Sequence, residues 1–203
     1  MEIKRIPLGD IQVNCYLVTG KSGALLIDPG FFTPEIEEFL NENADKERLI
    51  LLTHAHYDHI GAAKQLREDT GVKIAVGEYE NSFLSDPAVN LSRMFGDELN
   101  PFSADILLKD GEILQVGDIY VSVMHTPGHT SGGISFMIEN NLFSGDTLFY
   151  HSIGRTDFPT GDYGVLSKTV KKLYELDGDT AVLSGHGPET TIAEEKNNNP
   201  YIR

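Results

Sequence analysis

His54-Ala55-His56-Tyr57-Asp58-His59 follows closely on an apolar run, Leu49-Ile50-Leu51-Leu52. Such a run is typical of a buried strand, so the six residues are expected to form the loop at its end. Three imidazoles and a carboxylate crowded at a strand end are costly unless something pairs with them. Imidazole and carboxylate are ligands that zinc, iron and manganese accept. This stretch therefore predicts a metal site at the end of a buried strand.

The composition fits a single domain with a sizeable core, because 40% of the 203 residues are hydrophobic. The formal net charge of −15 argues against a broad surface for nucleic acid or anionic membrane. The one cysteine, Cys15, allows no disulfide within the chain. The N-terminus lacks the apolar core of a signal peptide, and no segment approaches membrane-spanning length. We therefore expect a reduced, cytoplasmic protein, whose oligomeric state the sequence does not fix.

Apolar segments separated by turn residues predict a strand-rich chain with helices after some of the strands. Thr33 followed by Pro34 is typical of a helix start. Further helices are expected over residues 60–69, 164–176 and 189–197, and the less regular residues 78–103 are expected to be a mobile or lid-like segment. Because strands followed by helices occur twice, we predict an α+β fold with two sheets packed face to face and helices outside. The strands are expected over residues 3–8, 13–18, 24–27, 49–52, 72–76, 106–109, 112–115, 119–125, 134–138, 142–144 and 180–183.

Three further ligand-type residues, His129, Asp146 and His186, each follow another of the expected strands. Functional groups commonly gather on loops at the strand ends of a rigid scaffold. A glycine stands immediately before each of the three, which lets the backbone approach closely or adopt positive φ. Beside the first loop, we interpret all three as metal ligands.

The complete candidate set is too large for one tetrahedral ion and fits two. A carboxylate can bridge two ions, so Asp146 is the natural shared ligand, and we predict Asp58 and Asp146 as the catalytic carboxylates. Two ions roughly 3.5–4 Å apart lower the pKa of a shared water toward neutrality, which favours hydrolysis. Zinc is the expected metal, although the ligand set also accepts iron and manganese. His151 is a further candidate for the substrate pocket. The predicted metal ligands are His54, His56, Asp58, His59, His129, Asp146 and His186.

These residues resemble the metallo-β-lactamase superfamily and, within it, the short glyoxalase II-like hydrolases. The resemblance covers nearly the whole chain, and its motifs are more specific for the superfamily than for the subfamily. The matching motifs are Ile27-Asp28-Pro29-Gly30, Thr53-His54-Ala55-His56-Tyr57-Asp58-His59, Thr126-Pro127-Gly128-His129-Thr130, Ser144-Gly145-Asp146-Thr147-Leu148-Phe149, Gly154-Arg155-Thr156-Asp157-Phe158-Pro159 and Gly185-His186-Gly187-Pro188.

The resemblance implies a four-layer αββα sandwich with its site along one edge of the two sheets. It assigns His54, His56 and His129 to one metal ion. It assigns Asp58, His59 and His186 to the second ion, with Asp146 bridging. In glyoxalase II-like enzymes a bridging hydroxide attacks a thioester carbonyl, so the resemblance implies a thioester hydrolase that acts on a small molecule.

One departure from the longer glyoxalase II enzymes and one shared position bear on the substrate. Those enzymes carry a C-terminal helical domain that helps hold glutathione, and this sequence ends soon after His186. We therefore expect one domain over residues 1–203 without a helical substrate domain, and a substrate such as a hydroxyacyl-thiol conjugate. Arg155 falls where the longer enzymes carry a basic residue near the substrate. It is a candidate for binding a carboxylate or thiol-peptide, or else a surface residue paired with Asp157.

Two alternatives to a dinuclear hydrolase stay open. Persulfide dioxygenases of the same superfamily also carry Gly-Arg-Thr-Asp-Phe, but they use a single iron held by residues that match His54, His129 and Asp146. A metal-stabilised interaction module without catalysis is the other alternative. Nuclease activity is disfavoured by the acidic charge. β-Lactamase activity is disfavoured because that family's usual zinc-bound cysteine would align with Asp146. Flavodiiron-type electron transfer is disfavoured because His56 stands where those proteins place a glutamate.

Overall fold

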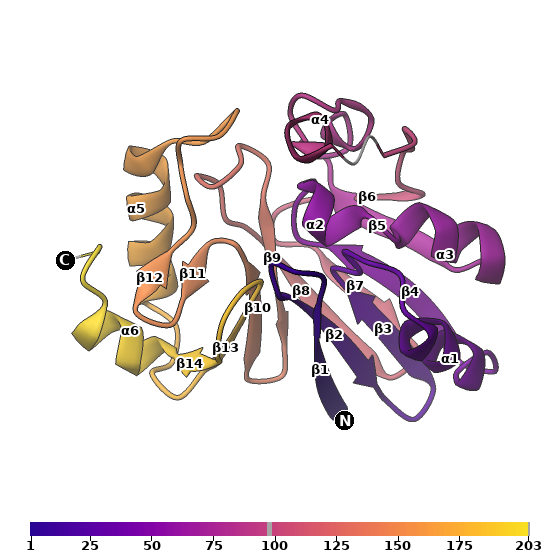
Figure 1. Ribbon diagram of the computed structural model, residues 1–203. Helices are drawn as coiled ribbons and strands as arrows, with labels where there is room; N and C mark the ends of the chain where they lie inside the picture. Colours follow the sequence, from indigo (N-terminus) through magenta and orange to yellow (C-terminus); the bar gives the residue numbers. More distant parts are fainter. Residues whose placement is uncertain (97–98, 203) are drawn as a thin grey trace.

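The computed structural model, which describes residues 1–96 and 99–202, has two six-stranded sheets packed face to face, with helices on both outer sides (Figure 1). The strands in chain order are β1 (Glu2–Leu8), β2 (Val13–Thr19), β3 (Gly23–Ile27), β4 (Glu47–Leu52), β5 (Lys73–Gly77), β6 (Ile106–Leu108), β7 (Ile113–Val116), β8 (Ile119–His125), β9 (Ile134–Ile138), β10 (Asn141–Gly145), β11 (Leu148–Phe149), β12 (Ser152–Ile153), β13 (Ala181–Ser184) and β14 (Thr190–Thr191). The helices are α1 (Pro34–Glu42), α2 (Tyr57–Ile60), α3 (Ala63–Thr70), α4 (Ser92–Phe95), α5 (Tyr163–Leu173) and α6 (Ile192–Asn198), with a 3₁₀ turn at Phe83–Ser85.

Alternation along the strands places side chains in two different cores. In β4, Leu49 and Leu51 face the second sheet, whereas Ile50 and Leu52 face the helices on the outer side. The strand is therefore apolar on both faces, which is the pattern of a strand buried inside a layered sheet. This explains the continuous apolar run that precedes the predicted metal loop.

Three hydrophobic clusters separate four layers. The first lies between the first sheet and helices α1 and α3, the second lies between the two sheets, and the third lies between the second sheet and helices α5 and α6. Two sheets with a helical layer on each outer face form an αββα sandwich (Figure 1). The predicted fold class is confirmed.

The strand directions bring the predicted site residues to one edge. The first sheet has the order β1-β2-β3-β4-β5-β6, in which β3, β4, β5 and β6 run parallel. The second has the order β14-β13-β10-β9-β8-β7, in which β10 runs parallel to β13. Because β9 is antiparallel to both β8 and β10, the strand β8 has the same direction as β10. The carboxyl ends of β8, β10 and β13 therefore share one edge of the sheet.

Several predicted elements differ in the structure. The expected helix over residues 60–69 is α3, which begins only at Ala63, and an unexpected short helix, α2, precedes it, so Asp58 and His59 lie on a helix rather than in a loop. The turn between them contains Gly61, where a Cβ atom would lie 2.2 Å from the carbonyl oxygen of Gly30. The last helix begins at Ile192 instead of residue 189, because Thr190–Thr191 pairs with β13. The hairpin β11–β12 was not expected from the sequence.

Other expectations on local structure are confirmed or lie partly outside the described residues. Helix α1 begins after Thr33, whose hydroxyl accepts a hydrogen bond from the Ile36 N–H at 3.4 Å, and Pro34 is its first residue. The expected lid-like segment of residues 78–103 includes residues 97–98, which lie outside the described part of the chain. No helix among the described residues is long and apolar enough to cross a membrane.

Candidate metal centre

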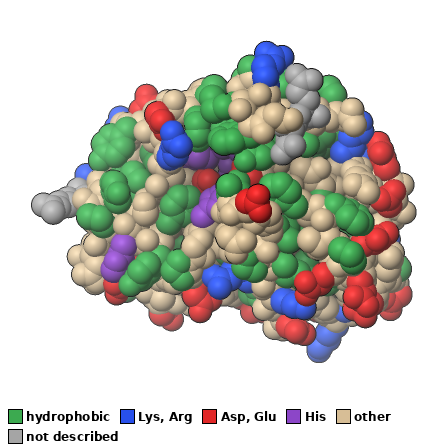
Figure 2. All heavy atoms as spheres, viewed as in Figure 1, with side chains coloured by type: hydrophobic (Ala, Val, Ile, Leu, Met, Phe, Trp, Pro, Cys, Tyr) green, Lys and Arg blue, Asp and Glu red, His purple; other side chains and the backbone are tan. Residues whose placement is uncertain are grey.

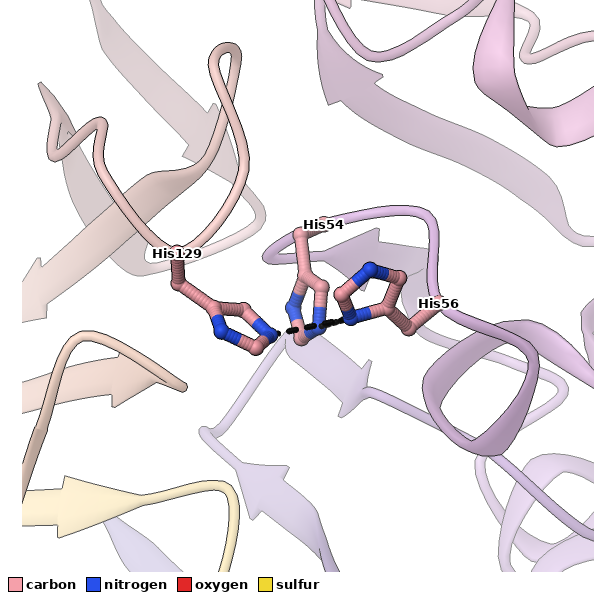
Figure 3. A group of neighbouring side chains, drawn as sticks. All are labelled: His54, His56 and His129. Atoms are coloured by element: carbon pink, nitrogen blue, oxygen red, sulfur yellow. Dashed lines mark hydrogen bonds between the residues drawn. The ribbon is translucent and has the colours of Figure 1, made fainter. Parts of the chain in front are cut away.

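Three histidines from two different sheets point toward one another at the common edge (Figure 3). His54 and His56 follow β4 in the first sheet, and His129 follows β8 in the second. The distance from His56 Nδ1 to His54 Nε2 is 3.1 Å, and the distance to His129 Nε2 is 2.9 Å. All three side chains are buried, with at most 5% of each residue exposed. We call these residues the three-histidine group.

The outer nitrogens of two of these rings fix which nitrogen carries the proton. His129 Nδ1 lies 2.7 Å from the Arg155 carbonyl oxygen, which only accepts, so Nδ1 donates and Nε2 presents a lone pair to the centre. The Thr53 hydroxyl donates to Asp28 at 2.7 Å, so His54 Nδ1 donates to that hydroxyl at 3.0 Å, and His54 Nε2 also faces the centre as a lone pair. Two acceptor nitrogens thus converge on His56, which has one proton to share between its own two nitrogens.

Burial keeps this group neutral. It lowers the pKa of His54 well below the ordinary histidine value, with the neighbouring imidazoles adding to the effect. Burial also lowers the pKa of His56 to about 3 and depresses the pKa of His129. Neutral imidazole is the form that binds metal ions. The three histidines are therefore neutral imidazoles near neutral pH, each with one nitrogen free of a proton.

A second group consists of Asp58, His59 and His186, which we call the aspartate group. Asp58 Oδ2 lies 3.5 Å from His59 Nε2 and 3.3 Å from His186 Nε2. Asp58 and His59 come from helix α2, and His186 comes from the loop after β13. His59 is completely buried, while 28% of the His186 side chain is exposed. The group thus combines one carboxylate with two imidazoles at the open side of the site.

Charge decides the protonation of the aspartate group. Burial alone lowers the pKa of His59, but the carboxylates of Asp58, Asp146 and Asp28 outweigh burial and raise it well above the ordinary value. Burial likewise opposes protonation of His186, and the hydrogen bond to Asp58 reverses that effect and raises its pKa. The metal-free aspartate group therefore holds protons that the three-histidine group does not.

Asp146 lies between the two groups. Its Oδ2 is 3.5 Å from His129 Nε2 and 3.7 Å from His186 Nε2, and its Oδ1 is 3.4 Å from His59 Nε2. Burial raises the pKa of a carboxyl, but the adjacent His59 holds the pKa of Asp146 well below its usual range. His54, His59 and Asp146 also have ligand atoms within 4.8 Å of one another, so the two groups form one continuous cluster.

The side chains of this cluster are better suited to binding cations than to pairing with one another. His59 Nε2 and Asp146 Oδ1 are buried and, although they lie 3.4 Å apart, neither has a hydrogen-bond partner among the described residues, which is costly for groups of this polarity. Gly185 leaves the space beside them open, since a Cβ atom there would lie 2.2 Å from Asp146 Oδ1. Imidazole nitrogens and carboxylate oxygens are suitable donors for zinc, iron and manganese. The donor set and its unpaired atoms therefore fit bound metal.

Asp28 is a functional residue to which the sequence analysis gave no role. Its Oδ2 lies 2.9 Å from His59 Nδ1, and its two oxygens also accept from the Thr53 N–H and hydroxyl. A carboxylate behind a metal-binding histidine fixes the ring and its tautomer. The signal available in the sequence is only that Asp28 follows a buried strand; the structure adds a positive φ of 51°, which is strained for a residue other than glycine.

Asn14 anchors the loop that carries His186. Its backbone N–H donates to the Gly185 carbonyl at 2.7 Å, and its side-chain amide donates to the carbonyls of Ser184 and Gly187, both at 2.9 Å. Tyr16 donates a further hydrogen bond to the Ser184 carbonyl at 2.7 Å. Strand β2 of the first sheet therefore holds a loop of the second sheet, which brings His186 to the helix that carries Asp58.

The two predicted substrate-binding residues lie in different surroundings. The Arg155 guanidinium pairs with both Asp157 oxygens, at 2.9 and 2.6 Å, and stacks over the Phe158 ring, whose centroid is 5.9 Å from that of His56. Arg155 thus lies near the three-histidine group and is already paired. The His151 ring stacks on Tyr150, and its Nε2 lies 2.7 Å from Glu194 on α6. His151 therefore contacts the outer helix α6.

Aromatic side chains surround the opening of the centre. Phe158 packs edge-on against His56, and Phe149 packs edge-on against His186, with ring centroids 6.1 Å apart. Tyr57 stacks on the half-exposed Phe95 at 4.9 Å. Figure 2 shows histidine and acidic atoms in a hollow of this face, with hydrophobic side chains around it. The face over the centre is therefore hollowed and bordered by apolar side chains.

Comparison with known proteins identifies relatives over the whole length. The model of the metallo-beta-lactamase superfamily matches residues 8–186. The probable metallo-hydrolase YqgX of Bacillus subtilis is 38% identical over 207 residues, which cover 100% of this chain and 98% of the relative. Hydroxyacylglutathione hydrolase GloC of Haemophilus influenzae is 37% identical over 208 residues, covering 100% of this chain and 98% of GloC.

Solved structures agree with these matches. The crystal structure of the BLEG-1 B3 metallo-beta-lactamase has a TM-score of 0.91 and 40% identity, and the match covers 99% of both chains. The crystal structure of TTHA1623 in a di-iron-bound form has a TM-score of 0.85 and 32% identity, covering 98% of this chain and 100% of that one. The similarity therefore includes sequence as well as fold.

Proposed function

This chain belongs to the metallo-β-lactamase superfamily of metal-dependent hydrolases, and we propose that it hydrolyses a thioester with the help of two divalent metal ions. The observation that carries the proposal is the arrangement of seven ligand-type side chains as two groups on either side of one carboxylate, Asp146. One tetrahedral ion does not use seven ligands, whereas two ions that share a carboxylate do. The relative solved in a di-iron-bound form supports a pair of ions in this fold.

Each group has a defined role in this proposal. His54, His56 and His129 would hold one ion, Asp58, His59 and His186 would hold the other, and Asp146 would contact both. When bound, the ions supply an acidified water and polarise the acyl carbonyl of the substrate. The chain itself keeps His129 and His59 in the metal-binding tautomer through the Arg155 carbonyl and Asp28. Catalysis then depends on how well these partners hold the ligands.

The thioester is supported by the relative from Haemophilus influenzae, whose name specifies the hydrolysis of an acyl conjugate of glutathione. The aromatic residues at the opening suit an apolar acyl group or thiol, because Phe158 and Phe149 lie against the ligand histidines. Zinc is the metal that we propose, with iron and manganese as the alternatives that the same donors accept. A small-molecule substrate agrees with a formal net charge of −15, which opposes binding to nucleic acid.

A second candidate substrate class is the β-lactams. It is favoured by the structure named as a B3 metallo-beta-lactamase, which is 40% identical over 99% of this chain. The two substrate classes share the attack of water on an acyl carbonyl, so the same metal centre would serve both. β-Lactamase activity is disfavoured by the aspartate at position 146, where that family's usual cysteine would align, and a chromogenic cephalosporin tests for this activity directly.

The deciding experiment combines metal content with turnover. The purified protein is analysed for zinc, iron and manganese, and is then assayed in metal-loaded and chelated form with a panel of acyl thioesters. Two further assays test the alternatives: oxygen uptake with a persulfide as substrate, and hydrolysis of a chromogenic cephalosporin. We expect two ions per chain and metal-dependent release of thiol. Oxygen uptake with a single iron would instead support a dioxygenase, and bound metal without any turnover would support an interaction module.

A further inference from the structure

Glu80 is a fully buried carboxylate that the proposed reaction does not use. It lies in the turn after β5, and 0% of the residue is exposed. Burial raises its pKa, against the lowering effect of the hydrogen bonds that it accepts. A buried carboxylate without a cation is expensive unless it is well hydrogen-bonded. The hydrogen bonds that Glu80 accepts must therefore stabilise it in the interior.

The two oxygens of Glu80 hold two different ligand loops. Oε2 accepts the backbone N–H of Ala55, which stands between His54 and His56, at 2.8 Å. Oε1 accepts the backbone N–H of Gly132, three residues after His129, at 3.0 Å. The first loop belongs to one sheet and the second loop to the other. One carboxylate thus connects the two segments that form the three-histidine group.

The close approach of Gly132 is a separate sign that this contact is specific. A Cβ atom at that position would lie 2.9 Å from Glu80 Oε1 and 2.8 Å from Tyr79 Cβ, so only glycine fits without displacing its neighbours. A backbone hydrogen bond from Ile134 N–H to the Thr53 carbonyl, at 2.9 Å, joins the same two segments nearby. Glu80 therefore acts at the junction of the sheets, directly behind the histidines.

We propose that Glu80 is a positioning residue that sets the spacing of His54 and His56 relative to His129, and so determines how tightly the three-histidine group holds its ion. The inference rests on the proposed role of that group in metal binding. Both carboxylate oxygens accept hydrogen bonds, whereas a glutamine offers one acceptor and turns an NH₂ group toward a backbone N–H. The Glu80→Gln substitution therefore releases or repels one loop while preserving the size of the side chain.

A matched control is available in Glu195, another glutamate with 0% exposure. It accepts hydrogen bonds from the His151 N–H, the Thr190 hydroxyl and the Asn199 amide, all in the outer layer formed by α6 and its neighbours. Glu195→Gln removes a buried carboxylate of the same kind without touching a ligand loop. A role of Glu80 in stability alone would make the two variants alike in metal binding.

The test is a titration of the metal-free protein with Co²⁺ and Zn²⁺, with a chelator as competitor and the Co²⁺ visible spectrum as the second readout. Thermal denaturation of the metal-free form establishes that each variant is folded. We expect Glu80→Gln to weaken the ion of the three-histidine group by about 10-fold, the lower end of the effect of losing a group bonded directly to a ligand, because Glu80 acts through the backbone. The ion of the aspartate group should keep its affinity, and Glu195→Gln should bind both ions as the wild type does.

The outcomes separate this inference from the proposed function. A folded Glu80→Gln variant that binds both ions as tightly as Glu195→Gln would overturn the positioning role. If Glu80→Gln does not fold, Glu80→Asp decides, because it keeps the charge but reaches only one loop, and an unchanged affinity there would equally overturn it. If the wild type itself binds neither Co²⁺ nor Zn²⁺, the proposed metal function fails at that point instead.

Discussion

The three-histidine group and the aspartate group lie within one cluster but are built on different physical principles. The first contains three neutral imidazoles, each at most 5% exposed, with pKa values lowered by burial. The second contains a carboxylate beside two imidazoles whose pKa values are raised, and one of these, His186, has 28% of its side chain exposed. One half therefore presents lone pairs without charge, whereas the other half is held together by charge.

This difference predicts how each half would accept a cation. The nitrogens of His129 and His54 are oriented by the Arg155 carbonyl and by Thr53, and all three rings are neutral, so a cation enters without net release of a proton. In the aspartate group His59 holds a proton until a cation replaces it. The first half would therefore bind a cation with ligands that are already oriented. The second half would have to exchange a proton for the cation.

The largest effect is expected from Asp146→Ala, which removes the carboxylate that faces both halves. Thioesterase activity should fall by more than about 10³-fold, beyond the roughly 10- to 100-fold cost of losing a partner behind a ligand. The fold should survive, because Asp146 belongs to none of the three hydrophobic clusters that lie between the layers. The measurement is kcat/KM with a thioester together with circular dichroism. Full activity in this variant would refute the shared role of Asp146.

A smaller and one-sided effect is expected from Asp28→Asn. The substitution keeps the shape and tolerates the positive φ, but it weakens the acceptor that His59 Nδ1 and the Thr53 hydroxyl share. We expect the ion of the aspartate group to bind about 10- to 100-fold more weakly. The ion of the three-histidine group should change less, because only His54 is reached, through Thr53. Chelator competition monitors both ions, and equal weakening of the two would contradict the separation of the halves.

How far the sequence predicts this site depends on the range of the contacts involved. The seven ligand-type residues were recognisable because each follows an apolar strand or lies within the first histidine stretch, which are local patterns. The α2 helix was missed because four residues are too few for a helical period. Glu80 and Asp28 act on residues 25 positions away, and Asn14 acts on a carbonyl 170 positions away. Such roles arise from the packing of one sheet on the other, which no local pattern encodes.

The dependence of metal binding on pH should distinguish the halves without any substitution. The pKa of His59 is raised, so below that pKa a cation must displace a proton, and affinity falls by about tenfold per pH unit for each proton displaced. The pKa of His56 is about 3, and those of His54 and His129 are also lowered, so these rings are already neutral between pH 6 and 8. Titration calorimetry in buffers of different ionisation enthalpy counts the protons released. Release of a proton when an ion binds to the three-histidine group would contradict this assignment.

The smallest effects concern the two residues predicted to bind substrate, of which one lies beside the three-histidine group and the other lies against helix α6. Arg155 stacks on Phe158 beside His56, whereas His151 pairs with Glu194 on the outer helix. We expect Arg155→Ala to raise KM several-fold with little change in kcat, because a contact made equally in the ground and transition states is lost. His151→Ala should leave both parameters unchanged and lower Tm slightly. An increase in KM for His151→Ala alone would indicate instead that the substrate binds near α6, away from the three-histidine group.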